Sequence, residues 1–107
     1  MFACQIVKLY LSLLKNKGAV EVLGKQVLRS GTSIGANLEE AVAGQSKADF
    51  VSKCSIALKE ARETKYWLRL LIETNLLPAK ELNPLLKESS ELVAILTTIV
   101  KNVRIKK

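Results

Sequence analysis

The 107-residue sequence contains no histidine, only two cysteines and few aromatic residues. Without histidine, the commonest general base of enzymes is missing. Cys4 and Cys54 stand far apart, match no metal-binding or redox spacing, and have no candidate base partner in the sequence. No P-loop or dinucleotide fingerprint occurs, and the acidic residues form no Glu-x-x-His pair of the di-iron type. We therefore expect no catalysis, no cofactor and no metal site.

Long apolar runs, prolines and glycines are also scarce. No run approaches the roughly 20 apolar residues that span a bilayer. Residues 1–14 are apolar but are interrupted by Gln5, Lys8 and Tyr10, and no small-residue cleavage site follows them. We therefore expect no signal peptide, no membrane partner and a cytoplasmic location. Two prolines and five glycines leave little material for an all-β or loop-rich fold.

The sequence does contain apolar residues at helical spacing in four segments. Those from Phe2 to Leu13 follow one another at steps of four and three, and the later stripes repeat this spacing. The pattern predicts helices at about 2–16, 19–43, 47–75 and 79–104. Alternating steps of four and three are the repeat of a bundle seam. We expect one all-α domain over residues 1–107, an antiparallel up-down-up-down four-helix bundle.

Residues with turn and capping preferences separate these segments. The sequence Lys15–Gly18 is expected to end the first helix, and Ser46 is a candidate N-cap for the third. Pro84 is expected either to kink the fourth helix or to mark its regular start. Three glycines share one face of the second segment: Gly24, Gly31 and Gly35. They either let another backbone approach closely or merely loosen this helix, which we expect to be continuous.

The segment 47–75 has unlike flanks on the two sides of its core stripe. Acidic residues lie on one flank and basic residues on the other. Contact between the acidic flank of one copy and the basic flank of the next is heterologous, and repetition with closure forms a ring. The alternative is a solvated helix with intrahelical pairs such as Lys59–Glu63.

A polar strip that contains Ser30 runs beside the core stripe of the second segment. We expect it to form a hydrogen-bond network at a helix–helix or subunit seam, where Arg62 or Lys65 reaches Glu40. The alternative is an anion or nucleotide site. The strip and the two flanks together supply the candidate subunit-interface residues: Ser33, Asn37, Glu40, Glu60, Arg62, Glu63, Lys65, Trp67 and Arg69.

The formal net charge of +7 favours a polyanionic partner, RNA or DNA before an anionic membrane surface. Because aromatic residues for base stacking are scarce, we expect phosphate contacts with little sequence specificity. The basic end of the chain has an alternative role as a solvated helix end. The rival class of function is a structural or adaptor module that binds a partner protein. The nucleic-acid-binding candidates are Lys8, Lys15, Lys17, Lys101, Arg104, Lys106 and Lys107.

Three stretches carry a resemblance: LRSGTSIGANLEEA at 28–41, GQSKADF at 44–50 and SIALKEARETKYWLRLL at 55–71. With them the chain resembles the four-helix-bundle family encoded in intervening sequences of bacterial large-subunit ribosomal RNA genes. The resemblance implies a barrel-like homopentamer without an established activity. It also implies a relation to the accessory variability determinant of diversity-generating retroelements, a basic pentamer that binds nucleic acid and a reverse transcriptase. No functional residue is carried over from it.

Overall fold

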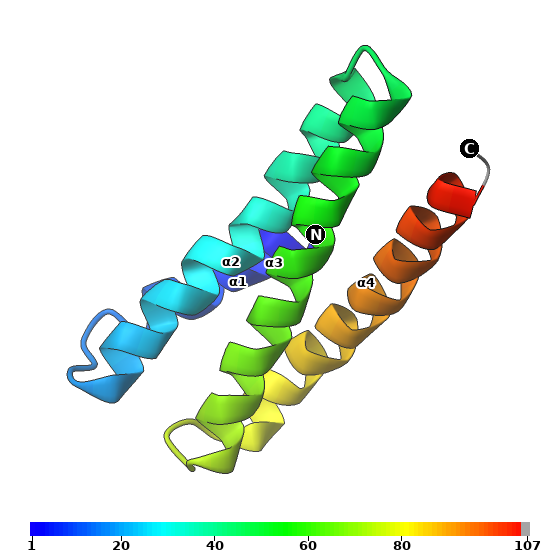
Figure 1. Cartoon of the computed structure of the whole chain (residues 1–107). Helices are drawn as coiled ribbons and strands as arrows, with labels where there is room; N and C mark the ends of the chain where they lie inside the picture. The colour runs from blue at the N-terminus through cyan, green and yellow to red at the C-terminus, as the bar shows by residue number, and fades with distance from the viewer. Residues whose placement is uncertain (106–107) are drawn as a thin grey trace.

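The computed structural model describes residues 1–105 of the chain, with side chains for residues 1–103. The described part contains four helices and no strand: α1 (Phe2–Ser12), α2 (Ala19–Ala43), α3 (Lys47–Glu73) and α4 (Ala79–Ile105). Consecutive helices run in opposite directions, and α2 and α3 lie side by side (Figure 1). The molecule is elongated, measuring 47 × 21 × 21 Å. The all-α, four-helix prediction is therefore confirmed.

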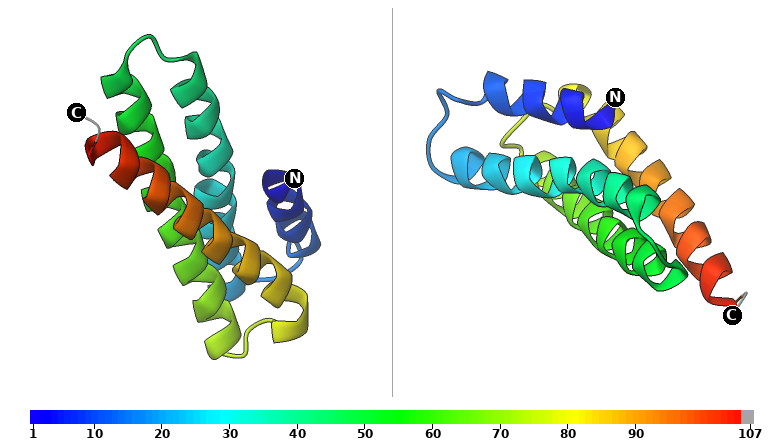
Figure 2. Two further views of the ribbon diagram at one scale, coloured as in Figure 1. Left: turned by 90° about the vertical axis from the view of Figure 1, so that its right-hand side faces the viewer. Right: turned by 90° about the horizontal axis from the view of Figure 1, so that it is seen from above.

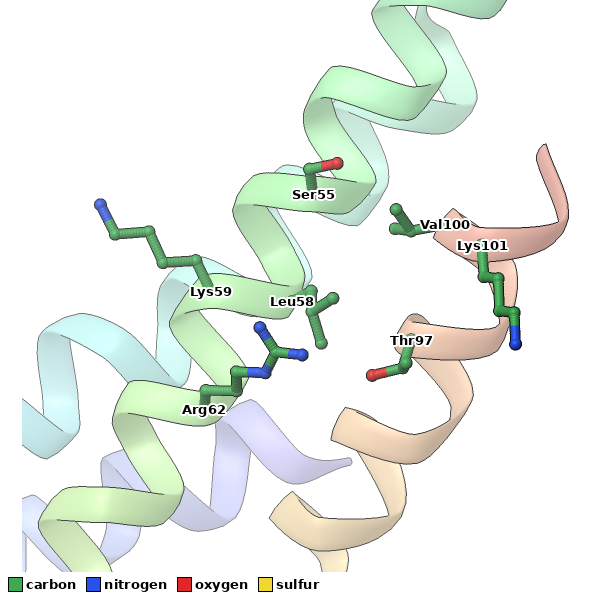
Figure 3. Close-up of a pocket in the computed structure, with 7 residues that line it drawn as sticks. All are labelled: Ser55, Leu58, Lys59, Arg62, Thr97, Val100 and Lys101. Atoms are coloured by element: carbon green, nitrogen blue, oxygen red, sulfur yellow. The ribbon is translucent and has the colours of Figure 1, made fainter. Parts of the chain in front are cut away.

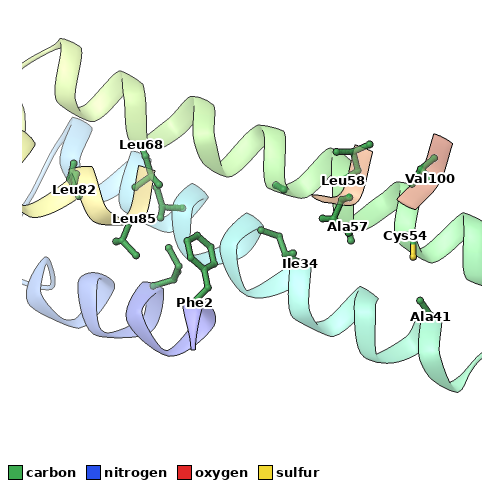
Figure 4. Close-up of a cluster of buried hydrophobic side chains, with 14 of the residues drawn as sticks. Phe2, Ile34, Ala41, Cys54, Ala57, Leu58, Leu68, Leu82, Leu85 and Val100 are labelled. Atoms are coloured by element: carbon green, nitrogen blue, oxygen red, sulfur yellow. The ribbon is translucent and has the colours of Figure 1, made fainter. Parts of the chain in front are cut away.

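The apolar stripes of the four helices meet in one core. Figure 4 shows Phe2 of α1, Ile34 of α2 and Leu68 of α3 among the buried side chains. The most extensive contact joins α2 to α3, whereas α4 packs mainly on α3 and α1 mainly on α2. At about 1.5 Å per residue, the 11 residues of α1 are far too short to cover the 25 of α2. Figure 2 shows α1 lying over the N-terminal half of α2.

Helix α1 packs on α2 at two glycines. A Cβ placed on Gly31 would lie 2.9 Å from Cγ1 and Cγ2 of Ile6, and one on Gly24 would lie 3.4 Å from Cδ1 of Leu13. The nearest atoms at both positions belong to side chains of α1, so α1 packs tightly on Gly31 and makes an ordinary contact at Gly24, and the predicted close approach of another backbone is not found at either glycine. At Gly35 that prediction is wrong as well, because a Cβ there would have nothing within 4 Å.

The first helix ends at Ser12 rather than at the predicted residue 16. The backbone tightens there, with the N–H of Leu13 donating to the carbonyl of Tyr10 at 3.0 Å. This three-residue spacing ends the α-helical ladder and brings the buried Leu13 onto α2. Gly18, with a φ of +70°, is instead the residue that precedes α2.

The third helix begins and ends with clear caps. Ser46 Oγ accepts the N–H of Asp49 at 3.0 Å, as predicted for an N-cap. The helix ends at Glu73, slightly before the predicted residue 75, because Asn75 adopts a left-handed φ of 59°. The N–H of Leu76 then donates to the carbonyl of Leu71 at 3.1 Å, which closes a Schellman-type cap. Helix α4 continues through Pro84, so this proline does not mark its start.

Candidate nucleic-acid interface

The flank of α3 that faces α2 carries acidic residues paired within the chain. Arg29 of α2 pairs with both Glu60 and Glu63, and its Nη1 lies 3.2 Å from Oε2 of Glu60. Lys53 Nζ lies 3.0 Å from Oε1 of Glu40. These pairs bridge α2 and α3, so part of the negative charge of the acidic flank is offset within the chain.

The prediction that Arg62 or Lys65 reaches Glu40 is wrong within the chain. The antiparallel arrangement places Lys53 opposite Glu40, and Lys53 is its partner. Arg62 lies on the other flank of α3, where it faces α4. The alternative intrahelical pair of Lys59 with Glu63 is not formed either, since Glu63 pairs with Arg29.

The polar strip of α2 makes hydrogen bonds, and one of them crosses to α3. Ser30 is fully buried, its hydroxyl donates to the carbonyl of Gln26 at 2.9 Å, and it lies 2.8 Å from Thr64 Oγ1. This contact confirms the helix–helix seam expected for Ser30. Asn37 Nδ2 donates to the carbonyl of Ser33 at 2.8 Å, a bond within α2. The role of Ser33 and Asn37 between subunits stays a prediction.

The opposite flank of α3 borders an open cleft against α4. The cleft has a volume of about 640 Å³ and is lined by seven residues (Figure 3): Ser55, Leu58, Lys59, Arg62, Thr97, Val100 and Lys101. The buried side chains of Leu58 and Val100 form its apolar floor. In Figure 3 the Arg62 guanidinium extends into the gap toward Thr97, whereas the Lys59 ammonium extends away from α4. The cleft is thus a concave site with an arginine inside it and lysines at its edges.

The charges of this cleft are unbalanced. Its lining contains three cations and no acidic residue. Arg62, Lys59 and Lys101 form no ion pair with any residue in the described part of the chain. Ser55 Oγ is buried and has no hydrogen-bond partner among the described residues. Cations at a concave apolar site concentrate the positive potential, and a guanidinium can bind a phosphate with two hydrogen bonds. The arrangement is therefore suited to an anion.

The predicted nucleic-acid-binding residues do not form one patch. Lys101 lines the cleft together with Arg62, a residue that the sequence predicts at the subunit interface. Lys8 lies on α1, and both Lys15 and Lys17 lie in the α1–α2 connection, at the end of the molecule away from the last turns of α4 (Figure 1). The side chain of Arg104, and both Lys106 and Lys107, lie outside the described residues.

Sequence reasoning missed Lys59 as a member of this cleft. Its spacing of three from Arg62 places the two side chains on neighbouring turns of α3. This spacing can be read from the sequence, but the cleft itself becomes apparent only once the position of α4 beside this flank is known.

The remaining interface candidates lie on the accessible sides of α3. Arg69 is exposed and pairs along the helix with Glu73, at 3.8 Å. Lys65 and Trp67 are half-buried. The indole N–H of Trp67 is buried without a hydrogen-bond partner in the described part of the chain, and the ring makes an edge contact with Tyr66. Contact of these residues with a second subunit stays a prediction.

Residues 1–105 contain neither a candidate membrane-spanning helix nor a candidate metal site. No helix there is long and apolar enough to cross a membrane. No group of three or more cysteine, aspartate or glutamate side chains within the same range is arranged to hold a metal ion.

The helical fold and the sequence together define the class of protein. The sequence model of the 23S rRNA-intervening sequence protein family matches residues 1–98, and the chain belongs to this family. A crystal structure of a protein with unknown function from the S23 ribosomal protein family of Bacteroides thetaiotaomicron is 46% identical. It superimposes with a TM-score of 0.84 over 94% of this chain and 92% of that one. No curated protein matches the sequence.

Proposed function

We propose that the chain is a non-catalytic, homo-oligomeric protein that associates with RNA or DNA by binding phosphates, with little sequence specificity. The observation that carries this proposal is the α3–α4 cleft, in which Arg62, Lys59 and Lys101 have no acidic partner among the described residues. The other cations of α3 for which an ion pair is described, Lys53 and Arg69, have their charge offset within the chain. The unpaired cations of the cleft are available to a phosphodiester backbone.

The lining of the cleft also accounts for the expected lack of specificity. Its floor consists of Leu58 and Val100 and contains no aromatic ring on which a base could stack. Arg62 can hold a phosphate from inside the gap while Lys101 and Lys59 attract the strand at its edges. Phosphate contacts position a strand without reading its sequence. Catalysis is not part of the proposal, because the sequence has no histidine and the cleft has no acidic residue.

Oligomerisation would bring several copies of this weak site together and so raise the affinity for one strand. Each copy contributes one cleft, and linked clefts that contact the same strand bind far more tightly than a single cleft does. A ring of copies presents the clefts at regular intervals around its circumference. We favour five copies because the resemblance of the sequence implies a barrel-like pentamer.

The test compares two triple variants of the full chain. In the first, Lys59, Arg62 and Lys101 are each replaced by glutamate. In the control, glutamate replaces three exposed lysines outside the cleft, Lys25, Lys80 and Lys87. Both variants lower the net charge of +7 by the same amount. Binding to a labelled 20-nucleotide RNA and to a 20-base-pair duplex is measured by fluorescence anisotropy between 50 and 200 mM salt.

The cleft variant is expected to lose most of its affinity for both probes. For each phosphate contact removed, its salt slope should fall by about 0.7 with the single strand and by about 0.9 with a DNA duplex. The control variant should retain the slope, losing only the general attraction of the net charge. Equal losses in the two variants would show that the cleft is no special site. Binding by neither the wild type nor the control would contradict the proposed function itself.

The apolar floor favours a second candidate function, an adaptor module whose cleft receives an apolar side chain of a partner protein. Leu58 and Val100 are its basis, since a site for phosphate alone does not need them. Salt separates the two candidates, because phosphate binding weakens by orders of magnitude between 50 and 200 mM salt when many contacts are made, whereas apolar contacts persist.

A further inference from the structure

Helix α1 is apolar on its outer face as well as on its inner face. Its inner residues Phe2 and Ile6 are buried in the core. On the outer side, Val7 is exposed and Leu11 has 57% of its surface exposed. Lys8 is the single charged residue between Phe2 and Ser12. Helix α1 thus has apolar residues on its outer side as well as toward the core, a pattern typical of a helix that is buried on both sides.

A second unpartnered apolar face lies on the C-terminal half of α4. Ile95 is 56% exposed and borders a shallow hollow of about 340 Å³, which it lines with Ala94, Thr98 and Ile99. The Thr98 hydroxyl is bonded to the carbonyl of Ala94 within the helix, at 3.1 Å. Thr98 therefore needs no outside hydrogen-bond partner, and the hollow is apolar over most of its surface.

The two faces are alike in form, because each has a shallow hollow and an exposed aliphatic side chain. Ala3, Cys4, Val7 and Lys8 line a hollow of about 330 Å³ on α1, close in volume to the hollow on α4. Each face combines small residues, which let helices approach closely, with one projecting aliphatic side chain. The projecting residue is Leu11 on α1 and Ile95 on α4.

The two faces also match in charge. Lys8 is the lone charge of the α1 face, whereas the exposed Glu91 lies one helical turn before Ile95 on α4. At about 100° per residue, Glu91 and Glu88 point within 40° of Ile95, and the nearest preceding cation, Lys87, points about 80° away. A cationic apolar face and an acidic apolar face are therefore exposed on the same chain.

We propose that the outer face of α1 in one copy packs against the outer face of α4 in a second copy. Leu11 would enter the hollow beside Ile95, Ile95 would enter the hollow beside Val7, and Lys8 would lie against Glu91. This inference deepens the homo-oligomer of the proposed function and rests on it. It also moves the contact away from the flanks of α3, where Glu60 and Glu63 are already paired with Arg29.

The contact is heterologous, because it joins different faces of two identical chains. The two faces lie on α1 and α4, two helices that contact each other in the bundle. Copies joined by such a contact form a ring if the rotation between successive copies closes, and an open filament if it does not. The homo-oligomer of the proposed function corresponds to the closed case. The α3–α4 cleft stays outside the contact.

The test uses single substitutions at exposed positions of the full chain. Leu11→Glu places a charge on the α1 face, and Ile95→Glu places one on the α4 face. Val22→Glu is the matched control, because Val22 is 59% exposed on α2 and belongs to neither face. Sedimentation equilibrium without nucleic acid measures the assembly, and circular dichroism checks that each variant is folded. A buried unpaired glutamate should weaken assembly at least about 10-fold in Leu11→Glu and in Ile95→Glu, and Val22→Glu should assemble as the wild type does.

A mixture of the two variants tests the heterologous geometry. Each variant keeps one intact face, so an equimolar mixture of Leu11→Glu and Ile95→Glu should form a one-to-one dimer and no larger ring. A symmetric α1–α1 contact would instead be broken by Leu11→Glu alone and left intact by Ile95→Glu.

Three results would overturn this inference. They are a wild-type monomer at working concentrations, assembly of both variants at wild-type strength, and failure of the mixture to form a dimer. None of them bears on the cleft, whose RNA binding is measured separately on the glutamate triple variants. A chain that assembles through another surface would therefore contradict this inference and leave the proposed function standing.

Discussion

The two flanks of α3 differ in how they are used. Toward α2 the helix is closely packed, with the buried Ser30–Thr64 contact and with acidic side chains paired to Arg29. Toward the C-terminal half of α4 it borders a cleft of about 640 Å³, in which Arg62 has no ionic partner among the described residues. One helix thus supports a closed seam on one side and an open, positively charged groove on the other.

This difference separates charges that hold the fold from charges that can bind a partner. Ion pairs at the surface add little to stability, commonly about 0–1 kcal/mol. In this protein Arg29 offsets part of the negative charge of Glu60 and Glu63. Lys59, Arg62 and Lys101 have no such partner among the described residues, and they line a cleft with an apolar floor.

The largest expected effect on the free energy of unfolding comes from replacing a serine by leucine on each side of α3. Ser30→Leu inserts a larger side chain into the closed seam, where the serine is fully buried, and overpacking should cost about 1–3 kcal/mol. Ser55→Leu removes a buried hydroxyl without a described partner and fills part of the cleft. Its free energy of unfolding should stay within about 0.5 kcal/mol of the wild type or rise. Urea unfolding at one protein concentration measures both, and a similar loss in the two variants would contradict the contrast.

A smaller contrast of the same kind is expected along α2. Alanine at Gly31 gains about 1 kcal/mol of helix propensity but forces its Cβ against the stiff branched carbons of Ile6, 2.9 Å away. We expect a net loss of up to about 2 kcal/mol. Gly35→Ala meets open space and should gain about 0.5–1 kcal/mol. Thermal unfolding of both variants checks the pair, and a stabilised Gly31→Ala would show that α1 is not seated there.

The fold could be predicted from the sequence because periodic apolar residues and caps are local signals. The four helices, the Ser46 cap and the continuity of α2 through Gly31 follow from spacing and residue type alone. The early end of α1 at Ser12 could not, because it depends on Leu13 turning onto α2, a tertiary contact.

Only part of the candidate site could be predicted from the sequence, for a similar reason. The basic flank of α3 follows from the helical repeat, but its neighbour does not. Spacing could not tell that Arg29 would reach Glu60 and Glu63, or that α4 would leave a cleft beside Arg62. The partners of long side chains depend on the relative rotation and register of two helices. The apolar stripe of a single helix does not determine either of them.

The ion pairs between α2 and α3 should contribute less to the free energy of unfolding than the packing between these helices does. Arg29→Ala should cost about 0.5–1 kcal/mol at low salt, because it leaves Glu60 and Glu63 unpaired, and less at high salt. Lys59→Ala, on the cleft side, removes a cation that has no described partner and should change stability by less than about 0.5 kcal/mol. Urea unfolding at two salt concentrations compares them. A salt-independent loss for Arg29→Ala would point to lost packing of its side chain rather than to the ion pairs.

The smallest effect concerns the thiol of Cys54, which lies between the two flanks. Burial raises the pKa of Cys54 above its ordinary value, because desolvation disfavours the thiolate. The resulting stability is fully present below the thiol's unfolded pKa and is lost as the pH rises through the higher folded value. Cys54→Ala should flatten this alkaline loss of stability. Equal alkylation rates for Cys54 in the native chain and in the urea-unfolded chain would contradict its burial.

The most direct test of the central claim is a lysine-acetylation footprint of the wild-type protein with and without a 20-nucleotide RNA, read by mass spectrometry at low salt. If the α3–α4 cleft holds the phosphate backbone, bound RNA should protect Lys59 and Lys101 and leave Lys25, Lys80 and Lys87 as reactive as before. Protection spread evenly over all five lysines, or absent from Lys59 and Lys101, would contradict a nucleic-acid site in this cleft.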